Sequence, residues 1–483
     1  MTTFPVNMDI ITTDNNLNNP FVLRGEEAQK VWKDLKCIAG KSIGTLNSDG
    51  LWLFPDSGCS RYNDEIENSP ILTIEAGNDD EISLKTGNIM GFVGCGSTRL
   101  TIRSRFSQSN GNDWFMLYML QKVFAINVFA LDHSRSQDCA LDIAAMLFPY
   151  FLNKAMNQGV YREYVHREYN DSRMRGVIDF NAHFRNNYPF RKGKISYSTR
   201  EYVYNNTVTQ LIRHTIEHLQ RKTIFGGMLE SPETQKQVKQ IKMSTPTYRR
   251  SDLRKVMLAN TKPKIHPYYS EYRPLQRLCL QILRHERLGY GETNENIHGI
   301  LFDGAWLWEE YLNTTLSKAG FAHPKNKTGE GRYYPFKENR KNEMYPDFYY
   351  PKNCAENGDR IDMVADAKYK WLNTIERNDL FQMISYMHVM ASNKGIFICP
   401  AASSDTDVDG VVSQPFVSNE QYGTLRGKGG EIFICRVIIP KTDDYASFVR
   451  AMGQIEKEIV ALVKETYPSG GNNFYRLCET KRV

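Results

Sequence analysis

The chain has 483 residues, enough for two to four domains at about 150 residues each, and its 41% hydrophobic and 24% charged residues are typical of a globular protein. No apolar run reaches the length of a membrane span, the first residues lack the basic and apolar parts of a signal peptide, and the nine cysteines form no Cys-x-x-Cys pair. We therefore expect a cytoplasmic protein with reduced thiols, and its net charge of +6 is compatible with a polyanionic partner without identifying one.

Residues 1–110 have the pattern of a β-rich region with one early helix. The helix is expected over residues 25–36. Short apolar runs follow it, separated by clusters of Gly, Asn, Asp and Ser that favour turns. The expected strands are residues 51–55, 71–75, 81–87, 89–95 and 99–106.

Residues 111–292 are predicted to be mostly helical. Apolar residues recur at helical spacing over 112–125 and 138–156, and Gly159 marks the end of the second helix. A polar and aromatic segment follows, for which no element is assigned. Further helices are expected over 205–223 and within 225–290.

Two motifs that could bind a nucleotide or a metal fail in their context. "CIAGKS", residues 37–42, resembles the end of a phosphate-binding loop, but Leu35 stands where the loop requires its first glycine. We therefore expect no nucleotide bound by this chain. His214 and His218 share one helix face without a third ligand in view, so we expect surface residues rather than a metal site.

Residues 293–483 alternate between helices and strands, which predicts an α/β domain around a mixed sheet. The expected elements are a helix over 302–320, strands over 344–350 and 359–370, a helix over 378–392, strands over 395–400 and 431–440, and a long closing helix.

The sequence contains several triplets in which an acidic residue stands two positions before a lysine, and the context distinguishes one of them. Chance predicts about three such triplets in this composition, and three are present, so the triplet alone carries no information. Only Asp366 and Lys368 lie in a strand-like run, where the period of two places both side chains on one face. Asp347 lies in the preceding strand-like run, and the turn-rich segment between the runs predicts a hairpin that brings it beside Asp366.

Such a cluster has a specific chemistry. Two carboxylates with a third oxygen ligand suit Mg²⁺, which activates water for phosphodiester hydrolysis. A lysine two residues further on can orient or deprotonate that water, or stabilise charge at the phosphorus. The alternative is a β-hairpin whose polar face is merely solvated.

The helices on either side add polar groups at suitable positions. Trp308, Tyr311 and Leu312 form an apolar helix face, with Glu309 near its edge and Glu310 adjacent as a second candidate. In the later helix, Gln382 and Tyr386 are four residues apart and share one face.

This order of a helix with Glu, a strand with Pro-Asp, a strand with Asp-x-Lys and a helix with Gln resembles the PD-(D/E)xK nuclease superfamily. Within it, the sequence resembles the McrC family, the nuclease subunits of McrBC-type, GTP-dependent restriction systems. "GVYREYVHREYNDSRMRGVIDF" and "ISYSTREYVYNNTVTQLIRHTI" are similar to that family's Arg-Gly-x-Ile-Asp-Phe segment and the helix after it. "ISLKTGNIMGFVG" followed by "LTIRSRF" is similar to its β-rich start.

The resemblance implies a role for each matched residue. Asp347 and Asp366 would bind Mg²⁺, and Lys368 would be the catalytic lysine. Glu309 would match the helix glutamate that supports the metal site, and Gln382 the helix glutamine of the core.

The resemblance also implies a fold and a function. The fold is an α+β multidomain chain: a β-rich N-terminal domain (1–110) that couples to a partner, a mostly helical middle region (111–292), and a C-terminal α/β PD-(D/E)xK nuclease domain (293–483). The function is that of a Mg²⁺-dependent DNA endonuclease subunit of a modification-dependent defence complex. A separate AAA+ GTPase of McrB type would bind the GTP, and self-association would pair two nuclease sites for double-strand cleavage. The alternatives are a non-catalytic adaptor that stimulates the GTPase and a stand-alone nuclease.

Basic residues in the middle region could contact DNA phosphates, with tyrosines nearby. The alternative is that Tyr197, Tyr202 and Ile195 are packing residues with charges at the rim. The candidate contacts are Arg173, Arg175, Arg185, Arg191 and Lys192.

Overall fold

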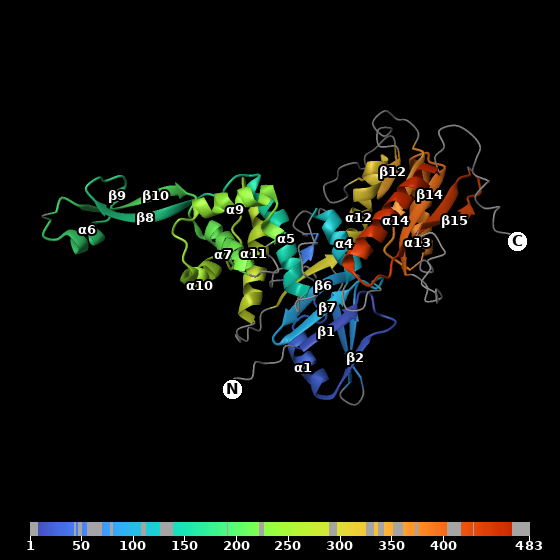
Figure 1. Cartoon of the computed structure of the whole chain (residues 1–483), viewed down its shortest axis with the longest axis horizontal. Coiled ribbons are helices and arrows are strands. Elements are labelled where there is room, and N and C mark those ends of the chain that lie inside the picture. The colour runs from blue at the N-terminus through green and yellow to red at the C-terminus, as the bar shows by residue number, and fades with distance from the viewer. Residues whose placement is uncertain are drawn as a thin grey trace. The chain divides into compact units, whose positions relative to one another are not determined.

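The computed structural model describes residues 8–42, 45–46, 51–55, 70–77, 81–107, 113–125, 139–190, 192–221, 227–288, 297–324, 333–336, 342–350, 361–371, 375–402, 417–427 and 429–465. The chain forms two compact units, one of Met1–Ala125 with Thr293–Val483 and the other of Ile126–Glu292 (Figure 1). Among the helices in these ranges, none combines the length and the apolarity needed to cross a membrane.

The first unit begins with two β-sheets and helix α1. The smaller sheet has the order β2-β5-β4 and the larger one the order β1-β7-β6-β11-β3. The predicted helix and five predicted strands are present, whereas β1, β2 and β11 were not predicted. Their bounds are β1 Met8–Thr13, β2 Phe21–Arg24, α1 Gly25–Leu35, β3 Leu51–Phe54, β4 Leu72–Ala76, β5 Glu81–Thr86, β6 Ile89–Cys95, β7 Thr98–Arg103 and β11 His298–Asp303.

Strand β11 joins the N-terminal sheet to the C-terminal part of the chain. It pairs antiparallel with β6 and parallel with β3. Two glycines permit the close approach: a Cβ at Gly91, whose φ is +127°, would lie 2.2 Å from Ile300 O, and one at Gly299 would lie 2.4 Å from Phe92 O. The N-terminal strands and the C-terminal half therefore share one sheet.

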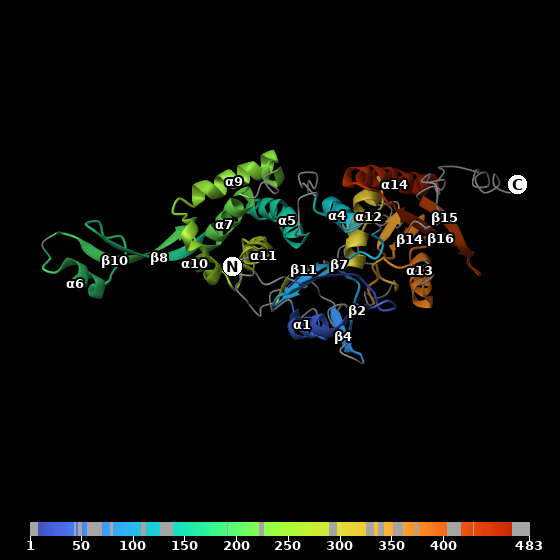
Figure 2. The same ribbon diagram turned by 60° about the horizontal axis from the view of Figure 1, so that its bottom comes forward.

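The second half of this unit is built on a mixed sheet, as the sequence predicted, and the sheet has five strands. Its order is β12-β13-β14-β16-β15; the strands from β13 to β16 run parallel, and both edge strands are antiparallel. Figures 1 and 2 show α12 and α14 on one face and α13 on the other. The edge strand β15 was not predicted. The bounds are α12 Gly304–Ala319, β12 Phe348–Tyr350, β13 Met363–Ala367, α13 Arg377–Val389, β14 Lys394–Ala402, β15 Val417–Thr424, β16 Glu431–Ile439 and α14 Tyr445–Glu465.

Helix α4 (Trp114–Val123) also belongs to this unit. It packs against α12, and the Tyr118 hydroxyl donates a hydrogen bond to Glu456 of α14 at 2.7 Å. The contacts of α4 and β11 thus cross the boundaries placed after residues 110 and 292, and the three-domain division stays a prediction.

The second unit combines helices with a three-stranded sheet of order β8-β10-β9. In both figures β8 and β10 extend away from the helices, and α6 lies at their far end. The sheet was not predicted, because β8 alternates half-buried with exposed residues and presents no buried apolar face. The bounds are α5 Cys139–Met156, β8 Glu163–Asp171, β9 Val177–Ile178, α6 Phe180–Asn187, β10 Ile195–Val203, α7 Thr207–Arg221, η3 Gly227–Leu229, α9 Pro232–Ser244, η4 Arg250–Asp252, α10 Leu253–Ala259 and α11 Tyr272–Leu288.

The prediction that His214 and His218 lie on the surface is wrong. Both are only 3% exposed, because α7 packs against α9, α10 and α11. Burial lowers the pKa of His214 to about 4. In the described residues, no group of three or more His, Cys, Asp or Glu side chains is placed to hold a metal ion.

Candidate active site

The predicted hairpin is confirmed and brings the two aspartates together. Strands β12 and β13 pair antiparallel, with Phe348 opposite Ala365. Asp347, directly before β12, accepts a hydrogen bond from the backbone N–H of Ala367 at 2.7 Å. Asp366 lies within β13 and is 1% exposed. The turn-rich segment between the strands, residues 351–360, lies outside the described residues.

Lys368 lies at the centre of the cluster. Its Nζ is 2.9 Å from Asp366 Oδ2 and 3.3 Å from Asp379 Oδ1, and it donates a hydrogen bond to Gln382 Oε1 at 3.0 Å. Gln382 in turn donates to the Tyr386 hydroxyl at 3.0 Å. The face that the sequence predicted from Gln382 and Tyr386 is therefore turned toward Lys368.

Asp379 is a member of the cluster that the sequence did not indicate. It stands in the first turn of α13, where it forms a capping box with Glu376, and it also contacts Lys370 Nζ at 3.0 Å. An aspartate at the start of a helix is explained by capping alone. Only the packing of α13 against β13 shows that the same carboxylate also reaches Lys368.

Helix α12 adds two glutamates beside a buried histidine. Glu309 Oε1 is 3.8 Å from His323 Nδ1, and Glu310 Oε1 is 3.9 Å from His323 Nε2. The same Nδ1 is 2.8 Å from the backbone O of Asp347, which ties the histidine to the hairpin. His323 follows a helix end, and nothing in its sequence context signals this position.

Burial and the nearness of several carboxylates raise the pKa values of acidic groups in the cluster. Burial raises the pKa of Asp366 to about 7, and the charge of Asp347 adds to this. Burial also raises the pKa of Glu309 well above its ordinary value, with further contributions from Asp347, Glu310 and Asp366. The direct contact of Glu309 is with His323, which in turn is bonded to the backbone O of Asp347.

Lys368 remains charged in this environment. Burial lowers its pKa, but the carboxylates of Asp366, Asp347 and Asp379 raise it by more, so the pKa lies above its ordinary value. In this arrangement Lys368 neutralises Asp366.

The donor chemistry of the cluster fits Mg²⁺. Asp366 Oδ2 is buried, and although it lies 2.9 Å from Lys368 Nζ, it accepts no well-formed hydrogen bond within the described residues. Carboxylate oxygens are the ligands that Mg²⁺ prefers, and a divalent cation would relieve the repulsion among Glu309, Asp347 and Asp366. The side chains as they stand do not yet form a three-ligand group in the part of the chain that the structure describes.

The basic residues proposed for DNA contact lie in the other unit. Arg173 and Arg175 follow β8, Arg185 lies on α6 and Lys192 precedes β10; all four are exposed, and Arg191 lies outside the described residues. Of the residues in the packing alternative, Tyr197 is buried and stacks on Tyr169 at 5.5 Å between ring centroids, whereas Tyr202 is 42% exposed. Packing thus accounts for Tyr197 and leaves the basic side chains in solvent.

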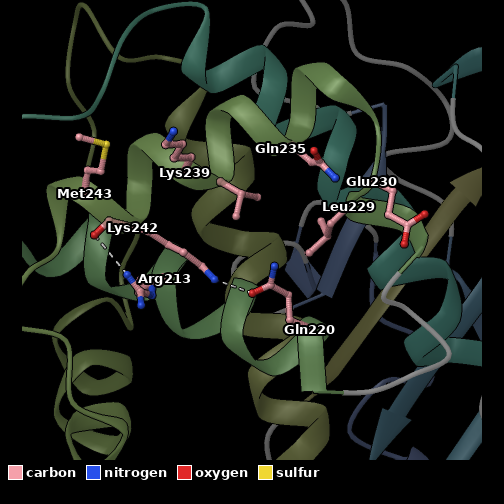
Figure 3. Close-up of a pocket in the computed structure, with 9 residues that line it drawn as sticks. Arg213, Gln220, Leu229, Glu230, Gln235, Lys239, Lys242 and Met243 are labelled. Carbon is pink, nitrogen blue, oxygen red and sulfur yellow. Dashed lines mark hydrogen bonds between the residues drawn. The ribbon is translucent and has the colours of Figure 1, made fainter.

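A pocket of about 800 Å³ opens between α7, η3 and α9 of the same unit (Figure 3). Two of its three basic side chains are already engaged: Arg213 donates to Lys242 O at 3.2 Å and to Glu217 at 2.9 Å, and Lys242 donates to Gln220 at 2.7 Å. No carboxylate pair or nucleophile converges on it among the described residues, so it is not the candidate site.

Comparison with known proteins identifies the family. A family model described as McrBC 5-methylcytosine restriction system component matches residues 84–400. The chain therefore belongs to this family, and the family predicted from the motifs is confirmed. No curated protein matches the chain.

Two solved structures are similar to it. One is a half-complex from a tetradecameric assembly of Thermococcus gammatolerans McrB AAA+ hexamers with bound McrC, with 14% identity and a TM-score of 0.47 over 94% of this chain and 100% of that one. The other is the Thermococcus gammatolerans McrBC complex, with 13% identity and a TM-score of 0.35 over 65% of this chain and 88% of that one.

Proposed function

We propose that this chain is the DNA endonuclease subunit of a modification-dependent restriction complex that acts against foreign DNA. The observation that carries the proposal is the convergence of Asp347, Asp366 and Lys368 from two paired strands, in a cluster to which Gln382 and Glu309 also belong. Buried carboxylates whose pKa values are raised by one another, beside a charged lysine, are typical of functional sites.

Each residue has a task in phosphodiester hydrolysis. Mg²⁺ bound by Asp347, Asp366 and Glu309 would neutralise the phosphate and lower the pKa of a coordinated water. Lys368, whose Nζ lies 2.9 Å from Asp366 Oδ2, would orient or deprotonate the water, or stabilise charge at the attacked phosphate. Gln382 and Asp379 fix the direction in which Lys368 points.

Cleavage by site variants tests the proposal. Asp366→Asn removes a charge from the metal site without changing its size, and we expect cleavage of plasmid DNA carrying 5-methylcytosine to fall by about 10³-fold or more. The matched control is Asp362→Asn, directly before the same strand, which should cleave within twofold of the unmodified chain. Equal activities of the two variants would rule out the assignment.

Metal binding has a readout that is independent of cleavage. If Mg²⁺ binds the folded chain, the ion stabilises the folded state by mass action. The free energy of unfolding rises by about 2.7 kcal/mol when the Mg²⁺ concentration is one hundred times the dissociation constant. Thermal unfolding should therefore move to higher temperature with Mg²⁺ for the unmodified chain and for Asp362→Asn, but not for Asp366→Asn. A shift of the same size in all three would place the ion elsewhere.

A partner AAA+ GTPase follows from membership of the family. One of the similar structures holds McrB AAA+ hexamers with bound McrC, and we propose the same kind of partner here, with GTP bound by the partner. Co-expression and co-purification test the assembly. Self-association that pairs two sites for double-strand cleavage stays a prediction, which sedimentation of the DNA-bound complex would test.

The second candidate function is an adaptor that stimulates the GTPase without cutting DNA. It is favoured by the absence of a preformed three-ligand group among the described residues. Two measurements separate the two functions. An adaptor stimulates GTP hydrolysis but does not bind Mg²⁺ at Asp366 and does not cleave DNA.

A further inference from the structure

The residue after Lys368 is held by the N-terminal sheet. Tyr369 is 3% exposed, and its hydroxyl forms a hydrogen bond with Ser104 Oγ at 2.7 Å and lies 3.4 Å from Met90 Sδ. Its ring packs edge-on against Phe106, with 5.0 Å between the centroids. Ser104 and Phe106 follow β7 directly, and Met90 lies on β6.

Arg105 connects the loop after β7 to Tyr369. Its guanidinium lies 4.6 Å from the centre of the Tyr369 ring, and Nη2 donates a hydrogen bond to the backbone O of Tyr369. On its other side, Nη1 donates to Asp14 Oδ2 at 2.7 Å and to Asn88 Oδ1 at 3.1 Å. The side chains of Arg105 and Asp14 are 7% and 0% exposed, so this ion pair is buried.

This geometry requires an arginine. The planar guanidinium donates to three acceptors while stacking on a ring, which the single ammonium group of a lysine does not reproduce. The loop position of Arg105 is itself fixed, because its backbone N–H donates to Asp14 Oδ1 at 2.6 Å. Both the direction of the guanidinium and the position of the Arg105 backbone are therefore fixed.

The contact fixes the backbone at Lys368 from one side. The N–H of Lys368 donates to Ile398 O at 3.0 Å, which ties it to β14, while the carbonyl of the next residue is held by Arg105. Tyr369 also packs on the start of α12, since a Cβ at Gly304 would lie 2.8 Å from its ring. Arg105 and Tyr369 thus set both the backbone directly after β13, where Lys368 lies, and the beginning of the helix that carries Glu309.

We infer that Arg105 is a positioning residue for Lys368, through which the N-terminal sheet controls the geometry of the candidate active site. The inference rests on the proposed nuclease function. The Arg105 side chain is 7% exposed, and its hydrogen bonds go to Asp14, Asn88 and Tyr369. Its replacement should therefore lower the rate of the chemical step and leave DNA binding unchanged.

The test compares two conservative variants, one in the loop directly after β7 and one on β7 itself. Arg105→Lys keeps the charge beside Asp14 but cannot reach all three acceptors at once. The control is Arg99→Lys on β7, whose side chain pairs with Asp9 on β1. Both are assayed as full chains in complex with the GTPase partner, on plasmid DNA carrying 5-methylcytosine.

We expect Arg105→Lys to lower the maximal cleavage rate about tenfold, with the half-saturating DNA concentration and the rate of GTP hydrolysis within twofold of the unmodified complex. Arg99→Lys should stay within twofold in all three. The inference is overturned if Arg105→Lys keeps its cleavage rate, if both variants show the same fall, or if the change lies in half-saturation rather than in the rate.

If Arg105→Lys does not fold, a milder variant tests the inference instead. Tyr369→Phe keeps the ring and removes only the hydroxyl bonded to Ser104, and we expect about a threefold fall in the maximal rate. Ser104→Ala removes the same hydrogen bond, so the double variant should fall by less than the two single effects combined. Unchanged rates in Tyr369→Phe would overturn the inference.

Lys368→Ala, assayed in parallel, separates the two proposals. If it does not cleave while Arg105→Lys cleaves normally, the nuclease function stands and the positioning role fails. If Lys368→Ala cleaves normally, the proposed function fails and the inference fails with it.

Discussion

The two units of the chain differ in the sign of their charge. Ile126–Glu292 contains 27 Lys and Arg against 15 Asp and Glu, a net charge of +12, whereas the other unit contains 34 against 40, a net charge of −6. The +6 of the whole chain is the sum of these opposite values. A modest overall charge therefore conceals one unit suited to polyanions and one that gathers carboxylates.

The two units also differ in how their charged groups are held. In the acidic unit, Lys368 and Asp347 are enclosed and contact several fixed partners. In the basic unit, Arg173, Arg175 and Arg185 are exposed. Substitution in the first should abolish a chemical step, whereas substitution in the second should weaken binding in increments that depend on salt.

The largest effect is expected at Asp347. Asp347→Asn removes the charge that would hold the cation but keeps an oxygen that can accept the Ala367 N–H. We expect cleavage to fall by about 10³-fold with little change in thermal stability. A fall of less than tenfold in the single-turnover cleavage rate would show that Asp347 is not a metal ligand.

A smaller effect is expected at Gln382. Gln382→Leu removes one of three partners of Lys368 and leaves Asp366 and Asp379 in place. The maximal cleavage rate should fall about tenfold, because the lysine loses the hydrogen bond that holds it on the side of α13. Ser385→Ala, an exposed position of the same helix, should stay within twofold; a similar fall in both variants would point to damage to α13 as a whole.

These two predictions concern a site that was only partly visible in the sequence. The hairpin and the Gln382 face were predictable because strand and helix periods are local properties. Asp379 and His323 were not, because one has the ordinary position of a capping residue and the other joins the site through tertiary packing alone. Whether the matched residues catalyse the reaction stays a prediction.

The fold shows the same limit. Most strands of the N-terminal region were predicted from apolar runs between turns, but β11 was not, since its partners β3 and β6 lie more than 200 residues earlier in the sequence. This pairing also argues against truncation as a test of partner coupling. Removal of residues 1–110 would take away four of the five strands of the sheet that contains β11, so point variants are the better test of partner coupling.

The smallest effects per residue are expected in the basic unit. Replacing Arg173, Arg175 and Arg185 by Ala should weaken DNA binding about tenfold at 0.1 M salt and reduce the slope of log K against log salt by about 0.9 for each phosphate that the variant no longer neutralises. A control variant with the same reduction in charge replaces the exposed Lys236, Arg250 and Lys255 by Ala. Equal effects of the two triple variants would assign DNA binding to the charge of the whole unit rather than to the end that carries α6.

The most direct test of the central claim measures two activities in one sample. The complex of Lys368→Ala with the GTPase partner is given GTP, Mg²⁺ and plasmid DNA carrying 5-methylcytosine, and both DNA cleavage and GTP hydrolysis are followed. We predict that cleavage falls below detection while GTP hydrolysis stays within twofold of the unmodified complex. Cleavage at the unmodified rate would contradict a catalytic role for the buried cluster in this chain.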